Sequence, residues 1–527
     1  MIQERYDVVI VGSGPGGATM AWKLAQTGKR ILLIERGGYL KRERENWDTR
    51  AVFAEGRYQA DETWASSSGA TFRPGLHYCV GGNSKVYGAA LFRLRQEDFG
   101  GVRHPDGLSP AWPVGYDVFE PYYQAAEALF QVHGQRGEDP TEPPTSGPYA
   151  HRPIRHEPRI QELADALSAE GLHPFHLPLG AMLDQDADGQ ATPHSPLLRC
   201  DPFDGYPSLT NGKADAQVIC VDPALRDHPN LILLQNAYVS RLLTDEAGHA
   251  VTGIETEIEG RRHVIRGDIV VVACGALSSA LLFLRSANAA HPDGLANSSG
   301  QVGRNYMRHN NATVLAISRR PNPTEFQKTL GLNDFYHAHD RSPANPHDFP
   351  LGHIQMVGKS DGAQIEAEGL PDFLQWLPEK PFSWIAAHSI DFWLTSEDLP
   401  RLESRVFYRD GRVHLDVVPT NLEAHGLLRE TLRRICDRTD IHPHLFDRTL
   451  YLGKDTPISG TAHQAGTLVF GEDPETSVLD LECRTHGLDN LYVTDASFFP
   501  SIGAVNPTLT IIANSLRVAD RIAARLA

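Results

Sequence analysis

The chain of 527 residues is too long for one compact domain, because most domains hold about 100–150 residues. Its 49 Lys and Arg against 66 Asp and Glu leave a net charge of −17, which argues against nucleic acid or another polyanion as a partner. A hydrophobic fraction of 41% and a charged fraction of 22% are typical of a globular protein and exclude a disordered chain. We therefore expect two domains, or one domain with large insertions.

The N-terminal residues predict a strand, a glycine turn and a helix. A β-branched run at 6–11 leads into the turn, and a helix is expected over 18–26. The first glycine of such a turn permits a tight bend, the second lets the backbone approach a pyrophosphate, and the third lets the helix pack closely on the strand. In this chain those three positions are Gly12, Gly14 and Gly17.

A second apolar run, at 30–34, ends at Glu35. A carboxylate at the end of this strand can accept a hydrogen bond from a ribose hydroxyl, while the helix N-terminus faces the phosphates. The strand, turn, helix, strand and acid together predict dinucleotide binding, with a plain tight turn as the alternative. The motif by itself does not separate FAD from NAD(P).

A second glycine cluster, within residues 78–93, indicates which of the two cofactors to expect. It contains Gly81, Gly82, Asn83 and Ser84. Here the chain resembles the glucose–methanol–choline (GMC) oxidoreductases, a family of FAD-dependent alcohol oxidases and dehydrogenases. The resemblance implies that this turn passes the flavin and the pyrophosphate, whereas an ordinary glycine loop before a helix is the alternative. Some members bond the flavin covalently to a histidine at the position of Val86, so the resemblance implies FAD held non-covalently.

The middle of the chain continues the resemblance. Residues 236–242 are similar to the family's strand whose backbone meets adenine, at Val239. Cys274 and Gly275 look like the next strand-to-helix turn against FAD, although Ser-Ser-Ala at 278–280 replaces the usual Ser/Thr-Pro. An NAD(P) oxidoreductase of the two-dinucleotide-fold type would need a second glycine motif, and Gly275 stands alone in its turn.

The C-terminal residues predict the rest of the FAD site. Asn506 before Pro507 is typical of a helix start, with Asn506 as the N-cap and Pro507 at the first helical position. The resemblance implies that this helix start, including Thr508, points at the flavin pyrimidine ring, where its N–H groups would stabilise negative charge. It also implies that Asp495 and Ala496 lie near the ribityl chain or the phosphates, with a strand-end turn as the alternative for Asp495.

Alcohol oxidation by a flavin needs a group that removes the hydroxyl proton while a hydride leaves the same carbon for flavin N5. Neutral imidazole, with a pKa near the working pH, suits that proton transfer. His463, within residues 459–467, and Asn506 occupy the positions of the family's catalytic pair, which is His–His in some members and His–Asn in others. The resemblance therefore implies that His463 is the base and that Asn506 orients the substrate.

These segments predict a discontinuous FAD-binding domain and an interleaved substrate-binding cap. The expected fold class is α/β (α+β overall), a Rossmann-like FAD-binding domain with a discontinuous substrate domain built on an antiparallel β-sheet. The FAD-binding pieces are residues 1–95, 203–310 and 455–527, and the cap comprises residues 96–202 and 311–454.

Short apolar runs between turn residues predict the strands of the cap. They lie at 312–317, 353–357, 384–393, 404–408 and 413–418. His353 and Gln355 are two residues apart, hence on one face of a strand, and are candidates to bind sugar hydroxyls. Side chains that point to solvent are the alternative.

The resemblance also bears on the substrate. Residues 109–113, Tyr122, Tyr123 and residues 132–134 look most like the family's sugar-oxidising branch, which includes bacterial pyranose oxidases, C-glycoside 3-oxidases and sugar dehydrogenase large subunits. The expected reaction oxidises a secondary hydroxyl of a sugar or glycoside to a ketone, with oxygen or an artificial or protein acceptor taking the electrons. One alternative is a sugar or polyol dehydrogenase large subunit that serves a separate partner subunit. Another is a flavin-stabilised binding protein without turnover.

No segment resembles a signal peptide or a membrane span, so we expect a cytoplasmic protein without direct membrane insertion. The chain has neither CxxC spacing nor Cys/His clusters, so no metal site is expected, and a homo-oligomer stays open. Free thiols are expected at Cys79, Cys200, Cys220, Cys274, Cys436 and Cys483.

Overall fold

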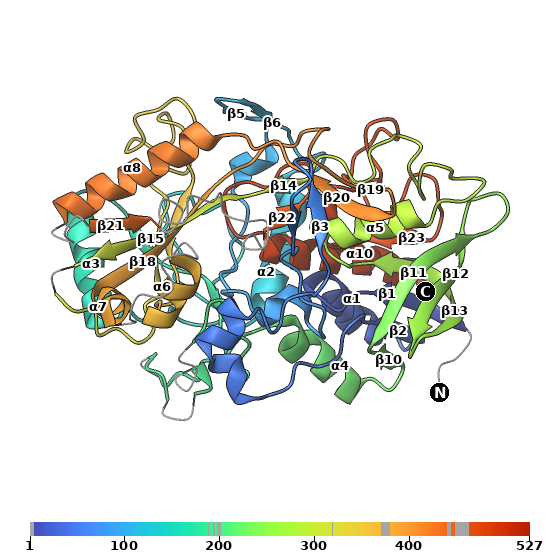
Figure 1. The fold of residues 1–527 in the computed structure, drawn as a ribbon, viewed down its shortest axis with the longest axis horizontal. Coiled ribbons are helices and arrows are strands. Elements are labelled where there is room, and N and C mark those ends of the chain that lie inside the picture. The colour runs from blue at the N-terminus through green and yellow to red at the C-terminus, as the bar shows by residue number, and fades with distance from the viewer. Residues whose placement is uncertain are drawn as a thin grey trace.

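The computed structural model describes residues 5–187, 189–192, 195–197, 202–318, 320–369, 380–439, 444–447 and 463–527. Figure 1 shows two parts side by side: a parallel sheet with its helices, which includes both the N-terminal and C-terminal segments, and an antiparallel sheet built mainly from the later middle of the chain.

The parallel sheet is built from apolar strands. β1 (Arg5–Val11) lies between β2 (Ile31–Ile34) and β13 (Arg261–Val272). Its other members are β10 (Leu231–Leu234) beside β2, β23 (Leu491–Val493) beside β13, and the antiparallel strands β12 (Val251–Ile258) and β11 (Ala237–Thr244). The parallel strands end at one common edge, which is where ligands bind in sheets of this kind.

Two helices pack against each other beside this sheet. α1 (Pro15–Ala25) follows β1, and α10 (Thr508–Leu526) contacts both α1 and α2 (Tyr116–Leu129). Although α2 falls within the segment expected for the cap, its Phe119 and Tyr123 are buried in the same hydrophobic core as the parallel sheet. The division into domains by residue number stays a prediction.

The antiparallel sheet has a hydrophobic core of its own. In spatial order its strands are β21 (His444–Asp447), β15 (Asn310–Ile317), β18 (Ser389–Ser396), β17 (His353–Met356), β16 (Leu330–Leu332) and β8 (Pro174–His176). The helices α3 (Pro158–Ala169) and α8 (Leu422–Arg438) contribute Leu163 and Leu428 to this core. The sequence predicts a Rossmann-like domain and an antiparallel-sheet domain, and this fold class is confirmed.

One predicted strand is wrong. Residues 384–393 are the end of α7 (Lys380–His388) and the first part of β18. A short apolar run fits either the helix period or the strand period, and here packing decides. Phe382 and Ala386, four residues apart, are buried in one cluster with Ile365, whereas Trp384 is 55% exposed.

The strands expected at 404–408 and 413–418 form, but in another sheet. β19 (Arg405–Arg409) pairs with β20 (Arg412–Asp416), and β20 continues the sheet with β3 (Trp64–Ser66) and β4 (Thr71–Phe72). The prediction of one sheet for all five runs is therefore corrected, because strand pairing with a distant segment leaves no local pattern in the sequence.

The remaining elements are short. The helices are α4 (Asp222–Asp227), α5 (Ala276–Arg285) and α6 (Gly362–Gly369), and the strand pairs are β5 (Val102–His104) with β6 (Gly107–Ser109), β7 (Val132–His133) with β9 (Leu179–Gly180), and β14 (Met307–Arg308) with β22 (Gln464–Ala465).

Two expectations about the chain as a whole concern membranes and thiols. Within the described residues, no helix is long and apolar enough to cross a bilayer. Five of the six cysteines are free: Cys79, Cys220, Cys274, Cys436 and Cys483. Cys200 lies outside the described residues.

Candidate active site

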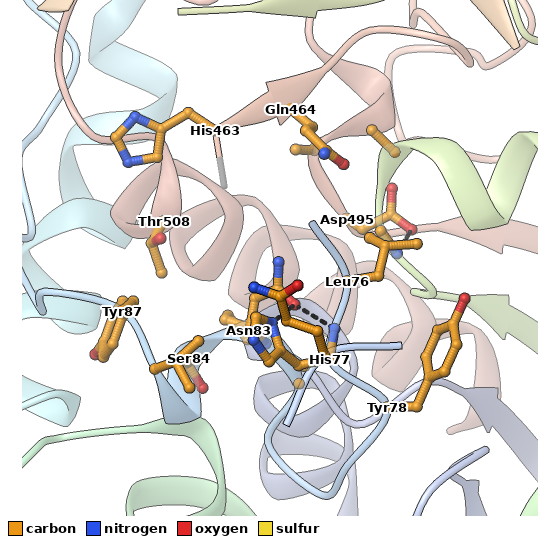
Figure 2. Close-up of a pocket in the computed structure, with 18 of the residues that line it drawn as sticks. Leu76, His77, Tyr78, Asn83, Ser84, Tyr87, His463, Gln464, Asp495 and Thr508 are labelled. Atoms are coloured by element: carbon orange, nitrogen blue, oxygen red, sulfur yellow. Dashed lines mark hydrogen bonds between the residues drawn. The ribbon is translucent and has the colours of Figure 1, made fainter. Parts of the chain in front are cut away.

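A cavity of about 790 Å³ brings the predicted site residues together. Its volume lies in the range of about 300–1,000 Å³ that is typical of cofactor and small-molecule sites. Figure 2 shows His463 and Thr508 on one side of this space and Tyr78 and Asp495 on the other. We call the lining around the glycine turns, Glu35 and Asp495 the nucleotide region, and the lining around His463 and Asn506 the catalytic region.

The first glycine turn leaves no room for a Cβ at Gly12 and Gly17 but leaves room at Gly14. Gly12 has φ +99°, and a Cβ on Gly17 would collide with the carbonyl oxygen of Gly12. A Cβ on Gly14, which lines the cavity, would meet nothing within 4 Å. No side chain caps the N-terminus of α1 and no acid lies in its first turn, so its N–H groups suit an anionic group such as a pyrophosphate.

The second glycine turn is hydrogen-bonded to the first. Gly81 (φ +95°) donates its N–H to Ser13 Oγ at 3.2 Å. Gly82, Asn83 and Ser84 line the cavity, whereas Gly81 does not. Ser84 Oγ donates to the Gly81 carbonyl oxygen at 2.6 Å, which holds the turn closed.

Glu35 is buried and braces the first turn. Its Oε2 accepts hydrogen bonds from Ser13 N at 3.0 Å and Ser13 Oγ at 2.7 Å, and its Oε1 accepts from Gly37 N at 3.0 Å. Burial raises the pKa of the Glu35 carboxyl, and these donors oppose the rise. Glu35 lines the cavity, so its remaining lone pairs can meet a ribose hydroxyl.

Asp495 braces the turn at Gly275 in the way that Glu35 braces the first glycine turn. Its Oδ2 accepts from Gly275 N at 2.9 Å and from the Ser279 hydroxyl, and its Oδ1 accepts from Ser497 N at 2.9 Å. Burial raises the pKa of the Asp495 carboxyl against these donors. The carboxylate therefore fixes the backbone around the cavity. The other residues predicted to meet the cofactor, which also line the cavity, are Val239, Cys274, Gly275, Ala496, Pro507 and Thr508.

The nucleotide region fits the dinucleotide that the sequence implies. It offers open space beside Gly14, an uncapped helix N-terminus for phosphates and a buried carboxylate for a ribose hydroxyl.

His463 and Asn506 are adjacent in the catalytic region. The Asn506 Nδ2 donates to His463 Nε2 at 3.3 Å, and both residues line the cavity. Within the described part of the chain, Asn506 Oδ1 has no hydrogen-bond partner. Burial lowers the pKa of His463 well below its usual value, and neighbouring His309, Lys328 and His353 lower it further. His463 is therefore a neutral imidazole at physiological pH.

The structure corrects the expected helix start. α10 begins at Thr508, with Pro507 in the N-cap position and no side-chain cap. Asn506 is not the N-cap, because its amide is turned towards His463 instead. Residues 459–462, which precede His463 in the predicted catalytic stretch, lie outside the described residues.

A second histidine lies behind His463. His309 Nδ1 is 2.9 Å from His463 Nδ1, and His309 Nε2 is 3.0 Å from the Gly503 carbonyl oxygen. The two histidines are 154 positions apart in the sequence, and no sequence signal links them.

The two candidates for sugar binding are both buried, so the solvent-facing alternative is wrong. Gln355 lines the cavity, and its Oε1 has no hydrogen-bond partner among the described residues. His353 is not part of the lining; its Nδ1 is 2.6 Å from Asn333 Oδ1 and its ring packs against Phe92.

The sequence did not single out the buried ion pair at the cavity. Lys328 Nζ lies 2.6 Å from Asp204 Oδ1, and both residues line the space. A lone lysine before a short strand carries no signal of this kind in the sequence.

Three family models match the chain. A model described as "NAD(P)-binding Rossmann-like domain" matches residues 10–46, and two models described as "GMC oxidoreductase" match residues 184–311 and 422–515. Paromamine 6'-oxidase from Streptomyces fradiae is 29% identical, and 6'''-hydroxyparomomycin C oxidase from Streptomyces lividus is 30% identical, each over 99% of this chain and 92% of the relative. Fructose dehydrogenase large subunit from Gluconobacter japonicus is 25% identical over 98% of this chain and 97% of the relative.

A solved structure shares the fold. The crystal structure of pyridoxine 4-oxidase from Mesorbium loti superimposes with a TM-score of 0.64 at 22% identity, covering 98% of this chain and 99% of that one.

Proposed function

Because the chain belongs to the GMC oxidoreductase family and is an FAD-dependent enzyme that acts on CH–OH groups, we propose that it oxidises a secondary hydroxyl of a sugar or glycoside to a ketone. The observation that carries this proposal is the pairing of a neutral imidazole, His463, with the Asn506 amide in the glycine-lined cavity.

Each residue of the pair has a distinct part in the reaction. His463 Nε2 takes the hydroxyl proton as the carbinol carbon gives up a hydride, so that the C–O bond becomes C=O. The Asn506 side chain orients the hydroxyl and shares the developing charge on oxygen without competing for the proton. Bound FAD supplies the two-electron acceptor for the hydride.

The cofactor would be held by the residues that the sequence singled out. Gly12, Gly14 and Gly17 form the first turn, Glu35 meets the ribose, and the Gly82–Ser84 turn faces the cavity. Val86 stands where some members carry a histidine bonded to the flavin, which supports non-covalent FAD.

The polar atoms in the catalytic region support a hydroxylated substrate. Gln355 Oε1 and Asn506 Oδ1 are buried acceptors without partners in the described part of the chain, and a buried polar atom left unpaired costs about 1–3 kcal/mol. Substrate hydroxyl groups would satisfy both. Relatives whose names specify paromamine and fructose lend further support to a sugar-like substrate.

A dehydrogenase that passes electrons to a separate acceptor or partner subunit is the second candidate. It is favoured by the similarity to a fructose dehydrogenase large subunit. A cytoplasmic location and a homo-oligomeric state stay predictions.

One experiment tests the proposal. Purified holoenzyme is titrated anaerobically with a panel of pyranoses and glycosides, the flavin spectrum is followed, and oxygen is then admitted. We expect sugars to bleach the flavin and to give a keto-sugar, while the rate of reoxidation separates an oxidase from a dehydrogenase. Bleaching of the flavin by simple primary or apolar alcohols alone, and by no sugar, would contradict the proposal.

A further inference from the structure

His309 is buried behind His463, and the mechanism above gives it no part. Its ring meets the His463 ring edge to face, with the two centroids 5.0 Å apart. The loop between β14 and β15 supplies His309, and a hydrogen bond joins it to His463 through the two Nδ1 atoms at 2.9 Å.

The far side of His309 determines where its proton lies. Nε2 is 3.0 Å from the Gly503 carbonyl oxygen, and a carbonyl can only accept, so Nε2 must carry the hydrogen. The buried ring is neutral, because burial lowers the pKa of His309 to about 4. Its Nδ1 is therefore a bare acceptor.

The same reasoning then applies to His463. One proton must lie between the two Nδ1 atoms, and His309 does not carry it, so His463 Nδ1 does. A neutral His463 with a proton on Nδ1 has a bare Nε2. The Asn506 Nδ2, which donates to that same Nε2 at 3.3 Å, agrees with this assignment from the opposite side.

The chain of hydrogen bonds extends beyond Gly503. The next amide, Ala504 N, donates to the Tyr336 hydroxyl at 3.1 Å, and that hydroxyl donates to Asp98 Oδ2 at 2.8 Å. Successive hydrogen bonds polarise one another, so this arrangement strengthens the Gly503 carbonyl as an acceptor.

Other titratable groups act on these hydrogen-bonded residues. Glu397, whose Oε2 is 2.9 Å from His104 Nε2, accepts from Gly503 N at 3.1 Å, and Lys328 and His353 act electrostatically on His463.

We propose that His309 is a positioning residue that holds His463 as the Nδ1–H tautomer and so keeps Nε2 unprotonated, able to accept the substrate's hydroxyl proton in place of the hydrogen bond from Asn506. The inference rests on the proposed role of His463 as the base. It goes beyond that role because it assigns the tautomer and names the residue that sets it.

The test compares substitutions at His309 in the FAD-loaded enzyme. His309→Leu removes the acceptor, so we expect the rate constant of flavin reduction by a saturating sugar to fall roughly 10- to 100-fold, within the range that general-base catalysis contributes. FAD content and the sugar concentration at half-saturation should stay within about twofold, because His309 does not line the cavity. His309→Asn places an amide oxygen near the former Nδ1 and should recover most of the rate.

A matched control uses a buried histidine that does not line the cavity. His133 donates from Nδ1 to the Arg152 carbonyl oxygen at 2.9 Å, and its pKa is also lowered to about 4 by burial. His133→Asn should leave flavin reduction unchanged. Native-rate reduction in His309→Leu, with His463→Ala inactive, would overturn the inference but keep His463 as the base. Native rates in both variants would overturn the role of His463 as the base, on which the inference rests, while failure of any sugar to reduce the flavin of the native enzyme would overturn the proposed function.

A second readout needs no variant at His309 to fold. In enzyme labelled with ¹⁵N-histidine, the ring signals that vanish in His463→Ala belong to His463. We expect these signals to show a proton on Nδ1 and none on Nε2 at neutral pH. A proton on Nε2 would overturn the inference.

Discussion

The nucleotide region and the catalytic region differ in whether their buried side-chain oxygens have hydrogen-bond partners. In the nucleotide region, the oxygens of Glu35 and Asp495 accept hydrogen bonds from the turns that they brace. In the catalytic region, Asn506 Oδ1 and Gln355 Oε1 have no hydrogen-bond partner within the described residues.

This difference indicates that the nucleotide region is preformed, whereas the catalytic region is completed by its ligand. Backbone turns locked by buried carboxylates can receive FAD without rearrangement, which lowers the entropic cost of binding. Unpaired acceptors can gain their partners when a hydroxylated ligand enters. Substitutions in the first region should therefore affect folding and cofactor content, and those in the second should affect rate and substrate affinity.

The largest expected effect is that of Gly17→Ala. Its Cβ would collide with the Gly12 carbonyl oxygen, so we expect a loss of about 3 kcal/mol or more in the free energy of unfolding and no recoverable holoenzyme. Gly14→Ala is the matched control, since its Cβ meets nothing within 4 Å. That variant should fold normally yet hold FAD more weakly. Thermal unfolding and flavin content would check both, and normal flavin binding by both variants would break the comparison.

Asn506→Ala should reduce the rate constant of flavin reduction roughly 100-fold, the usual cost of losing a donor at a developing negative charge. FAD content should be unchanged, because the side chain contacts His463 rather than the turns. Asn506→His retains a donor and should keep more of the activity. Stopped-flow absorbance at saturating sugar measures the effect; equal rates in Asn506→Ala and the native enzyme would contradict the role given to the amide.

Gln355→Leu should weaken sugar binding about three- to tenfold, since one hydrogen bond is worth about 0.5–1.5 kcal/mol. The rate constant at saturation should change little. Gln161→Leu, on the exposed face of α3, is the control. Steady-state KM values of Gln355→Leu and the native enzyme check this prediction. A lower rate constant with an unchanged KM would contradict it and would mean that Gln355 acts in the chemical step rather than in binding.

Among the effects on catalysis, that of Lys328→Met should be the smallest, a shift of the pH profile, although the loss of the Asp204 ion pair should also lower the free energy of unfolding. His463 acts as a base only when neutral, and the nearby Lys328 cation contributes to its lowered pKa. Removing the cation raises that pKa, so the acid limb of the flavin-reduction profile should move to higher pH, whereas Lys41→Met on the surface should not move it. A shift to lower pH would mean that the sign of this interaction is wrong.

The two regions also differ in how far the sequence could predict them. The glycine turn and Glu35 were predictable because their strand, bend and helix are contiguous, and local chemistry requires glycine at Gly12 and Gly17. His463 and Asn506 could be named as catalytic only from resemblance to a family, since no local pattern marks either residue as catalytic.

What could not be predicted depends on contacts between distant segments. The His309–His463 hydrogen bond joins residues 154 positions apart, and the Lys328–Asp204 pair joins two segments with no shared motif. The prediction that Asn506 caps the helix was wrong, because its side-chain amide forms a tertiary hydrogen bond with His463 instead of capping the helix N-terminus.

The most direct test of the proposed chemistry is the rate of anaerobic flavin reduction by a sugar in native enzyme and in His463→Ala, at matched FAD content. We expect the substitution to lower the rate constant by about 10²- to 10⁴-fold while sugar binding and the flavin spectrum are retained. Reduction at the native rate would contradict the assignment of His463 as the base.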